Sequence, residues 1–78
     1  MAKEILSPLP GTFYRKPSPD QPPFKNEGDA VAEGEVIGLV EVMKSFHEVT
    51  SQVAGTITAF LVDNEDAVMA GQPLATIE

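Results

Sequence analysis

The sequence predicts an all-β fold, in which two related halves pack face to face as a flattened antiparallel sandwich or barrel. Three observations lead to this prediction. The chain contains an internal repeat, its apolar residues come in short runs broken by Gly, Pro and Asp, and helical periodicity is weak throughout. Two related all-β halves that cannot each cover their own apolar face most simply pack against one another.

The internal repeat relates the first half of the chain to the second. Residues 29–34 are Asp-Ala-Val-Ala-Glu-Gly, and residues 66–71 are Asp-Ala-Val-Met-Ala-Gly. Each segment leads, at the same spacing, to an apolar residue followed by Glu, at 40–41 and at 77–78. A Gly-Thr pair also recurs, at 11–12 and 55–56. Each half therefore consists of a Gly-Thr strand, an acidic turn, a Gly turn and a closing strand.

Short strands are the elements expected within each half. Residues 36–42 and 56–62 are apolar over enough of their length to predict strands by themselves, and alternation such as Thr-Ile-Thr at 56–58 is typical of half-buried antiparallel strands. The recurrent glycines at 28, 34, 55 and 71 are expected in turns. Residues 16–23, Lys-Pro-Ser-Pro-Asp-Gln-Pro-Pro, interrupt the repeat and predict a stiff surface loop, because proline cannot join a central strand.

Length and composition limit the classes of function. Seventy-eight residues predict one domain over residues 1–78, and the absence of Cys leaves neither disulfides nor a thiolate metal site. A formal net charge of −7 disfavours nucleic-acid binding. There is no apolar run of membrane-spanning length and no signal-peptide pattern, so we expect a cytoplasmic protein. The Met at position 1 favours a free-standing subunit, and an excised domain is the alternative.

The segment that joins the halves, residues 41–46, is the candidate functional site. If a two-fold axis relates the halves, this joint lies at one end of the domain and the termini lie near the other. A two-residue hairpin normally uses Asn-Gly or Asp-Gly to reach positive φ, but here Met43 and Lys44 occupy the joint. Positions that break such a local rule are candidate functional positions. The alternative is an ordinary surface lysine in a continuous strand or short helix through residues 40–49.

With its flanking halves, this joint resembles the biotinyl domain of the biotin carboxyl carrier of acetyl-CoA carboxylase, within the biotinyl/lipoyl attachment family. The similarity covers essentially the whole chain. It is carried by Gly-Thr-Phe-Tyr-Arg at 11–15, Pro-Ser-Pro-Asp at 17–20, Glu-Val-Met-Lys at 41–44, Gly-Thr at 55–56 and Ile-Glu at 77–78. The resemblance implies a barrel-sandwich hybrid fold with Lys44 at a hairpin tip and biotin attached covalently to Lys44.

A carrier rather than an enzyme is what this resemblance implies. A biotin ligase would modify Lys44, a biotin carboxylase would carboxylate the biotin, and a carboxyltransferase would receive the carboxyl group, most simply in acetyl-CoA carboxylase and fatty acid biosynthesis. The other tip residues implied are Val42, Met43 and Ser45. Val42 and Ser45 replace the Ala and Met that the family usually has, so we expect any difference in recognition by the ligase or carboxylase to arise at these two positions.

The resemblance also gives the proline-rich loop a role. In the family the matching segment forms a thumb beside the biotin hairpin, which implies the same for Pro17, Ser18, Pro19 and Asp20. Lys16, where the family has Thr, and the prolines at 22–23 depart from that pattern. From the residues alone, an ordinary surface loop remains the alternative.

Two other functions and several unremarkable residues complete the predictions. A lipoyl carrier shares the fold, but its lysine usually follows Asp and precedes Ala. An unmodified interaction module with the same fold is the other alternative to a biotin carrier. His47, the single histidine, is expected to face solvent. Glu41 and Glu48 are expected to solvate the hairpin, with a contact to the ligase as the alternative. The serines show no Ser-His-Asp spacing. We therefore predict neither catalytic nor metal-binding residues.

Overall fold

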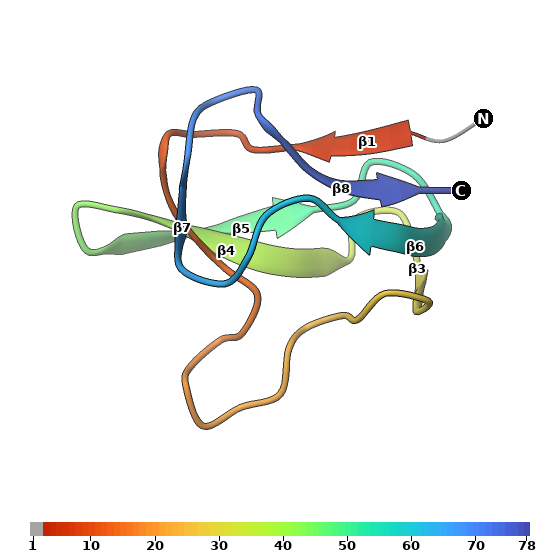
Figure 1. The fold of residues 1–78 in the computed structure, drawn as a ribbon, viewed down its shortest axis with the longest axis horizontal. Helices are drawn as coiled ribbons and strands as arrows, with labels where there is room; N and C mark the ends of the chain where they lie inside the picture. The colour runs from red at the N-terminus through yellow and green to blue at the C-terminus, as the bar shows by residue number, and fades with distance from the viewer. Residues whose placement is uncertain (1–2) are drawn as a thin grey trace.

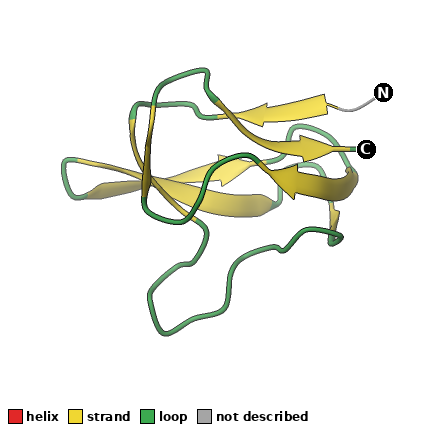
Figure 2. Ribbon diagram, in the orientation of Figure 1, coloured by secondary structure: helices red, strands yellow, loops and turns green. Residues whose placement is uncertain are grey.

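The computed structural model describes residues 3–78, and over that range it contains eight β-strands and no helix (Figures 1 and 2). The strands form two four-stranded antiparallel sheets, ordered β1-β8-β6-β3 and β5-β4-β2-β7. In chain order they are β1 (Lys3–Leu6), β2 (Gly11–Tyr14), β3 (Ala30–Val31), β4 (Val36–Val42), β5 (Ser45–Thr50), β6 (Gly55–Phe60), β7 (Asp66–Val68) and β8 (Pro73–Ile77). The all-β fold predicted from the sequence is confirmed. Across residues 3–78, no helix has the length and apolar character needed to cross a membrane.

The internal repeat relates the two sheets. The repeat matches β1 with β5, β2 with β6, β3 with β7 and β4 with β8, and this exchange converts the order of one sheet into the order of the other. Each sheet therefore takes two strands from each half of the chain. The face-to-face packing expected of the halves takes an interlocked form, in which neither half builds a sheet of its own.

Repeat-related side chains also fill the core between the sheets. Phe13 of β2 and Ile57 of β6 are fully buried equivalents, and each alternates with more exposed neighbours as a half-buried strand requires. Burial of each such side chain contributes about 1.5–3 kcal/mol. Phe13 is larger than Ile57, and a residue on the neighbouring strand of the same sheet compensates for the difference in each case. A Cβ at Gly38 would lie 2.6 Å from Phe13 Cε1, whereas the equivalent of Gly38 is the buried Ala75.

The recurrent glycines have two different structural roles. Gly34 and Gly71 adopt φ of 85° and 81° at equivalent turns, and Gly28 adopts 92°, as predicted for turn glycines. Gly55 was predicted in a turn, which is wrong, because it opens β6 with its backbone packed against β8. A Cβ at Gly55 would lie 2.5 Å from Ile77 Cγ2, so this position needs glycine for close approach.

The two long strands predicted from composition are both present. β4 has the predicted bounds, and β6 ends at Phe60 rather than at residue 62. Beyond that point Leu61 N still donates a hydrogen bond to Leu74 O of β8, at 2.8 Å, before the chain turns toward β7. The apolar character of residues 61–62 therefore extended the prediction past the strand end.

Candidate functional site

The joint between the halves is a two-residue β-hairpin turn between β4 and β5. Val42 and Ser45 form the last pair of the ladder, so Met43 and Lys44 are the two central residues of the turn. Their φ angles are 51° and 69°, which is the left-handed pattern of a type I′ turn. The alternative of a continuous strand or short helix through residues 40–49 is wrong.

This hairpin projects from one end of the molecule, and the start of β1 and the C-terminus lie at the other end (Figure 1). The arrangement is the one expected from a two-fold relation between the halves. Met43 is 93% exposed, and Lys44 and Ser45 are also exposed. Val42 is the exception among the four predicted tip residues, because it is half-buried and packs against the core. The tip therefore offers an unobstructed lysine on a strand pair whose base is anchored in the core.

Holding two side-chain-bearing residues at positive φ has an energetic cost, of order 1–3 kcal/mol at each position. The surrounding sheet imposes these positive φ angles, because the register of β4 is fixed by Ile37 and Val40, which are fully buried. The turn is thus held in shape by the sheet, although its residues are not those that a two-residue turn favours.

The proline-rich loop is closed at its base, at the ends predicted from the repeat. Arg15 O accepts a hydrogen bond from Phe24 N at 2.9 Å, so residues 16–23 form a loop that leaves and rejoins the body at one place. Within the loop, Gln21 N donates to Ser18 O at 3.1 Å. Figure 1 shows the loop extending below the sheets, on the same half of the molecule as the hairpin. The predicted surface loop is confirmed, and its four predicted thumb residues are exposed.

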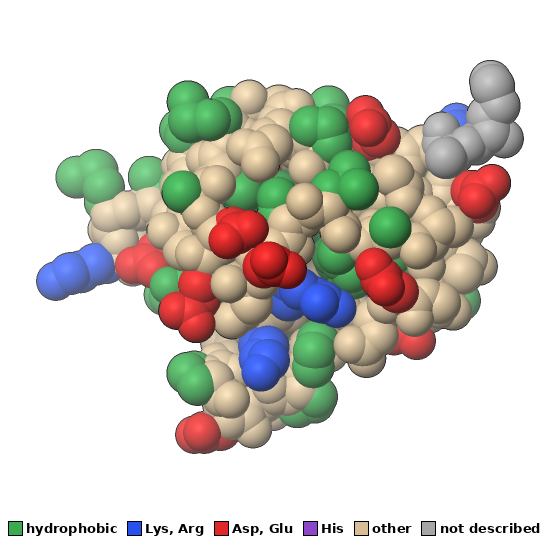
Figure 3. All heavy atoms as spheres, viewed as in Figure 1, with side chains coloured by type: hydrophobic (Ala, Val, Ile, Leu, Met, Phe, Trp, Pro, Cys, Tyr) green, Lys and Arg blue, Asp and Glu red, His purple; other side chains and the backbone are tan. Residues whose placement is uncertain are grey.

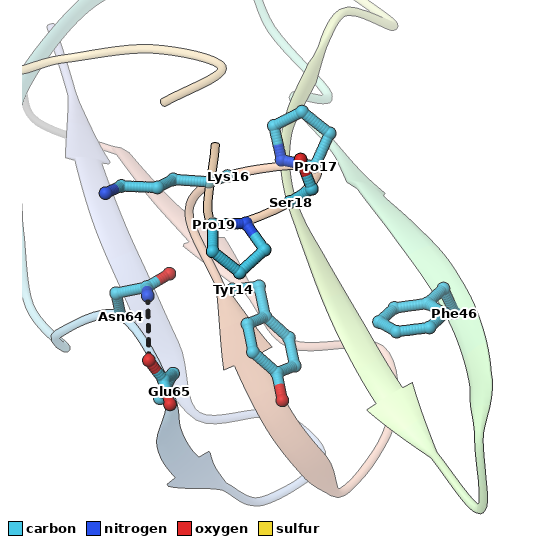
Figure 4. Close-up of a pocket in the computed structure, with 8 residues that line it drawn as sticks. All are labelled: Tyr14, Lys16, Pro17, Ser18, Pro19, Phe46, Asn64 and Glu65. Carbon is cyan, nitrogen blue, oxygen red and sulfur yellow. Dashed lines mark hydrogen bonds between the residues drawn. The ribbon is translucent and has the colours of Figure 1, made fainter. Parts of the chain in front are cut away.

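A pocket of about 520 Å³ lies between this loop and the hairpin strand β5 (Figure 4). The loop provides one wall, Phe46 of β5 faces it, Tyr14 of β2 lies between them, and the β6–β7 turn closes one side. The lining residues are Tyr14, Lys16, Pro17, Ser18, Pro19, Phe46, Asn64 and Glu65. The structure thus brings three of the predicted thumb residues to the pocket, but neither Asp20 nor any of the four tip residues lines it.

The hydroxyl of Tyr14 connects the pocket to the hairpin. It donates a hydrogen bond to Glu41 Oε1 at 3.0 Å, and the rings of Tyr14 and Phe46 lie 6.0 Å apart with an interplanar angle of 54°. The hydrogen bond to Glu41 raises the pKa of Tyr14 above its ordinary value, with smaller effects from desolvation and from the charges of Glu41 and Glu65. Glu41 was predicted simply to solvate the hairpin, which is wrong, because it is half-buried and accepts this bond.

Several pocket residues were missed by the sequence reasoning. Tyr14 had an available signal, because it is the single tyrosine and lies in the segment shared with the family. Phe46 lies in the predicted joint but was given no role of its own, and Asn64 had no signal, because a place in the pocket depends on contacts between segments far apart in the chain. His47 and Glu48 are exposed on β5, as predicted. Across residues 3–78, no group of three or more His, Cys, Asp or Glu side chains is arranged to hold a metal ion.

Comparison with known proteins identifies relatives over nearly the whole chain. A family model described as "Biotin-requiring enzyme" matches residues 3–77. The biotin carboxyl carrier protein of acetyl-CoA carboxylase from Chlamydia muridarum is 45% identical over 73 residues, which are 94% of this chain and 45% of that protein. Its Streptococcus pyogenes counterpart is 44% identical over 74 residues, 95% of this chain and 45% of that protein. The chain spans less than half the length of these relatives.

Solved structures agree on the fold. The crystal structure of Kluyveromyces lactis urea carboxylase matches with a TM-score of 0.81 and 27% identity, covering 100% of this chain and 6% of that one. A single-chain, multi-domain long-chain acyl-CoA carboxylase matches with a TM-score of 0.79 and 23% identity, over 96% of this chain and 7% of that one. In both, the matched region is a small part of a much larger polypeptide.

Proposed function

Because this chain belongs to the family of biotin-requiring enzymes, whose model spans residues 3–77, we propose that it is the biotin-carrying domain of an acetyl-CoA carboxylase, with biotin attached to Lys44. The Chlamydia muridarum and Streptococcus pyogenes relatives are carrier proteins, so the chain carries a cofactor and is not itself catalytic. We propose that residues 1–78 act as one such carrier domain.

One observation carries the assignment of Lys44. It is exposed at the centre of a two-residue turn that the sheet holds at positive φ, at the end of the molecule opposite the start of β1 and the C-terminus. A primary amine in this setting fits covalent biotin, because a ligase can close around the tip without meeting the rest of the domain. None of Lys3, Lys16 and Lys25 lies in a β-turn between paired strands.

The division of work between cofactor and protein follows from this geometry. Biotin, when attached, supplies the ureido nitrogen that holds the carboxyl group. Lys44 contributes the tether, and β4 and β5 present it at a fixed place. Tethering raises the effective concentration of the carried group at each active site, which is the physical advantage of a carrier over a free cofactor.

The partners proposed are those that a carrier requires. They are a biotin protein ligase, a biotin carboxylase that loads the carboxyl group and a carboxyltransferase that passes it to acetyl-CoA, in fatty acid biosynthesis. A formal net charge of −7 favours transient docking of a solvated module and disfavours nucleic acid as a partner. We propose the cytoplasm as the compartment.

The proposed role of residues 16–23 is that of a thumb beside the hairpin. The loop is closed at its base and forms one wall of a pocket whose opposite wall is Phe46, from the strand that follows the modified lysine. Pro17 and Pro19 limit the conformations of the loop, which lowers the entropy lost when it makes a contact.

Biotinylation in the presence of a biotin ligase tests the proposal. Co-expression should give one biotin per chain, detected with avidin and mapped to Lys44 by mass spectrometry. Lys44→Arg should abolish the label, because arginine keeps the charge but cannot form the amide. Lys3→Arg is the matched control and should be labelled like the original chain. A label on Lys3, Lys16 or Lys25 would contradict the assignment, and the mass of a lipoyl group on Lys44 would identify a lipoyl carrier.

A further inference from the structure

We propose that Arg15 is a positioning residue that fixes the conformation and position of loop 16–23 over the pocket, by joining both ends of the loop to the second half of the fold. The inference rests on the proposed function in one respect, which is that the position of the loop matters for loading the carboxyl group. The positioning itself is a property of this chain and can be measured without biotin.

Arg15 contacts the loop at its exit as well as at its start. Its carbonyl accepts the hydrogen bond from Phe24 N at 2.9 Å, and its Nη2 donates to Lys25 O at 3.4 Å. The second of these bonds is long and therefore weak. Lys25 is in turn held by an ion pair with Glu35 at 2.8 Å and by a hydrogen bond to Ala30 O at 3.0 Å. The exit of the loop is thus tied both to Arg15 and to the segment that follows.

The same arginine reaches across to the second half of the chain. Its Cζ lies 4.1 Å from the centroid of the Phe60 ring, at the end of β6, which is a cation–π arrangement. Its main-chain N donates to Asn64 Oδ1 at 2.8 Å, in the β6–β7 turn. A parallel connection comes from the exit side of the loop, because Phe60 N donates to Glu27 Oε2 at 3.0 Å.

Comparison of the two repeats shows that these contacts occur only in the half of the chain that contains loop 16–23. Counting from the repeated Gly-Thr pair, the equivalent of Arg15 is Ala59, which lies in β6. In the second half a short connection leads from β6 to β7, and there is no long loop to hold. The long cationic side chain is therefore present only in the half that contains the insert.

Stability alone does not account for an arginine at this position. Its Nε is buried and has no hydrogen-bond partner among the described residues. An unpaired buried donor is destabilising, and an apolar side chain of similar length would cover Phe60 without it. What an apolar side chain cannot do is present a planar cation to Phe60 while donating to the carbonyl of Lys25.

The test compares Arg15→Met and Arg15→Lys with Lys3→Met, a control that removes the same charge from β1. ¹⁵N heteronuclear NOE values of the Ser18, Asp20 and Gln21 amides report the order of the loop on unmodified protein. In Arg15→Met these values should fall well below those of the strands, with the thermal unfolding midpoint changed by only a few degrees. Labelling of Lys44 by the ligase should be unaffected. Loading of the carboxyl group by a biotin carboxylase should lose severalfold in kcat/KM, and Arg15→Lys should be intermediate.

Each result decides between the possibilities. Loop NOE values in Arg15→Met equal to those of the original chain would overturn the positioning role. If Arg15→Met does not fold, Phe60→Leu, which keeps the apolar volume and removes the aromatic face, should loosen the loop, and an unchanged loop there would also overturn it. If the loop becomes mobile in Arg15→Met but the rate of carboxyl loading is unchanged, Arg15 has a structural role only. That result would overturn the proposed effect of Arg15 on carboxyl transfer. Absence of biotin from Lys44 in the original chain counts against the proposed function, and the NOE comparison then still decides the positioning role.

Discussion

Glu65 occupies a backbone conformation that suits glycine. Its φ is 71°, and the repeat-equivalent residue is Gly28, with φ of 92°. A residue with a Cβ is disfavoured in this region, and such strain is found most often at functional positions. Glu65 lines the pocket and its charge contributes to the raised pKa of Tyr14. The strain is thus located at the pocket and not in the body of the fold.

Replacing Glu65 by glycine should therefore stabilise the protein. We expect Glu65→Gly to raise the free energy of unfolding by about 1 kcal/mol, because glycine adopts positive φ without steric strain. In a domain of this size that corresponds to roughly 4–8 °C in the midpoint of thermal unfolding. Glu65→Ala is the control, since it removes the carboxylate and keeps the Cβ. If the free energy of unfolding rises equally in both variants, the cause is loss of charge repulsion and not relief of backbone strain.

Tyr14 gives a second prediction at this scale, because it is the single tyrosine and the chain has no tryptophan. Ultraviolet titration should show a phenol pKa above its ordinary value, and Glu41→Gln should lower it by removing the charged hydrogen-bond acceptor. The phenol ionises more readily in the unfolded chain. Its contribution to stability is therefore complete below the unfolded pKa and is lost as pH rises through the folded one. A pKa unchanged by Glu41→Gln would contradict the role given to this hydrogen bond.

Among the elements, those with a local cause were predictable from the sequence. The bounds of β4 follow from its apolar run, and residues 16–23 are a loop because proline cannot donate to a ladder. The repeat located the joint between the halves, but the turn at residues 43–44 was implied by the family resemblance, since local turn preference argues against it. Composition alone left a continuous strand or short helix open at that place.

The pocket could not be predicted in this way. It depends on the approach of β2, β5 and the β6–β7 turn, segments whose mutual distance is set only by the packed sheets. The hydrogen bond between Tyr14 and Glu41 likewise follows from the pairing of β2 with β4, in which Thr12 lies opposite Glu41. Composition indicated that Glu41 would be solvated, and tertiary contact decided otherwise.

Shortening the loop tests the thumb at the scale of the element. Replacement of residues 16–23 by a short Gly-containing turn should leave the fold intact, because loop length changes the closure entropy only modestly. The hydrogen bond between Phe24 N and Arg15 O already brings the two ends together. Lys44 should be labelled normally, and loading by a biotin carboxylase should slow severalfold. Equal loading rates for equally biotinylated intact and shortened chains would reduce the loop to a surface feature.

At the scale of the whole molecule, the interlocked sheets make the two halves interdependent. Each sheet contains strands from both halves, so neither half can pair its strands or cover its apolar face alone. We expect fragments 1–43 and 44–78 to be unfolded when separate and to form β-structure when mixed, as measured by circular dichroism. A folded isolated fragment would contradict this account of stability.

The placement of the hairpin relative to the termini has a mechanical consequence. The molecule is 34 Å along its longest axis, with the lysine-bearing turn at one end and the start of β1 and the C-terminus at the other (Figure 1). The face drawn in Figure 3 carries acidic, basic and apolar side chains between these two ends. If the chain is attached to a larger assembly through its termini, the whole domain rotates about that attachment as a rigid body. A small rotation at the attachment then sweeps Lys44 through a wide arc, so the body of the protein adds its own length to the reach of the flexible side chain.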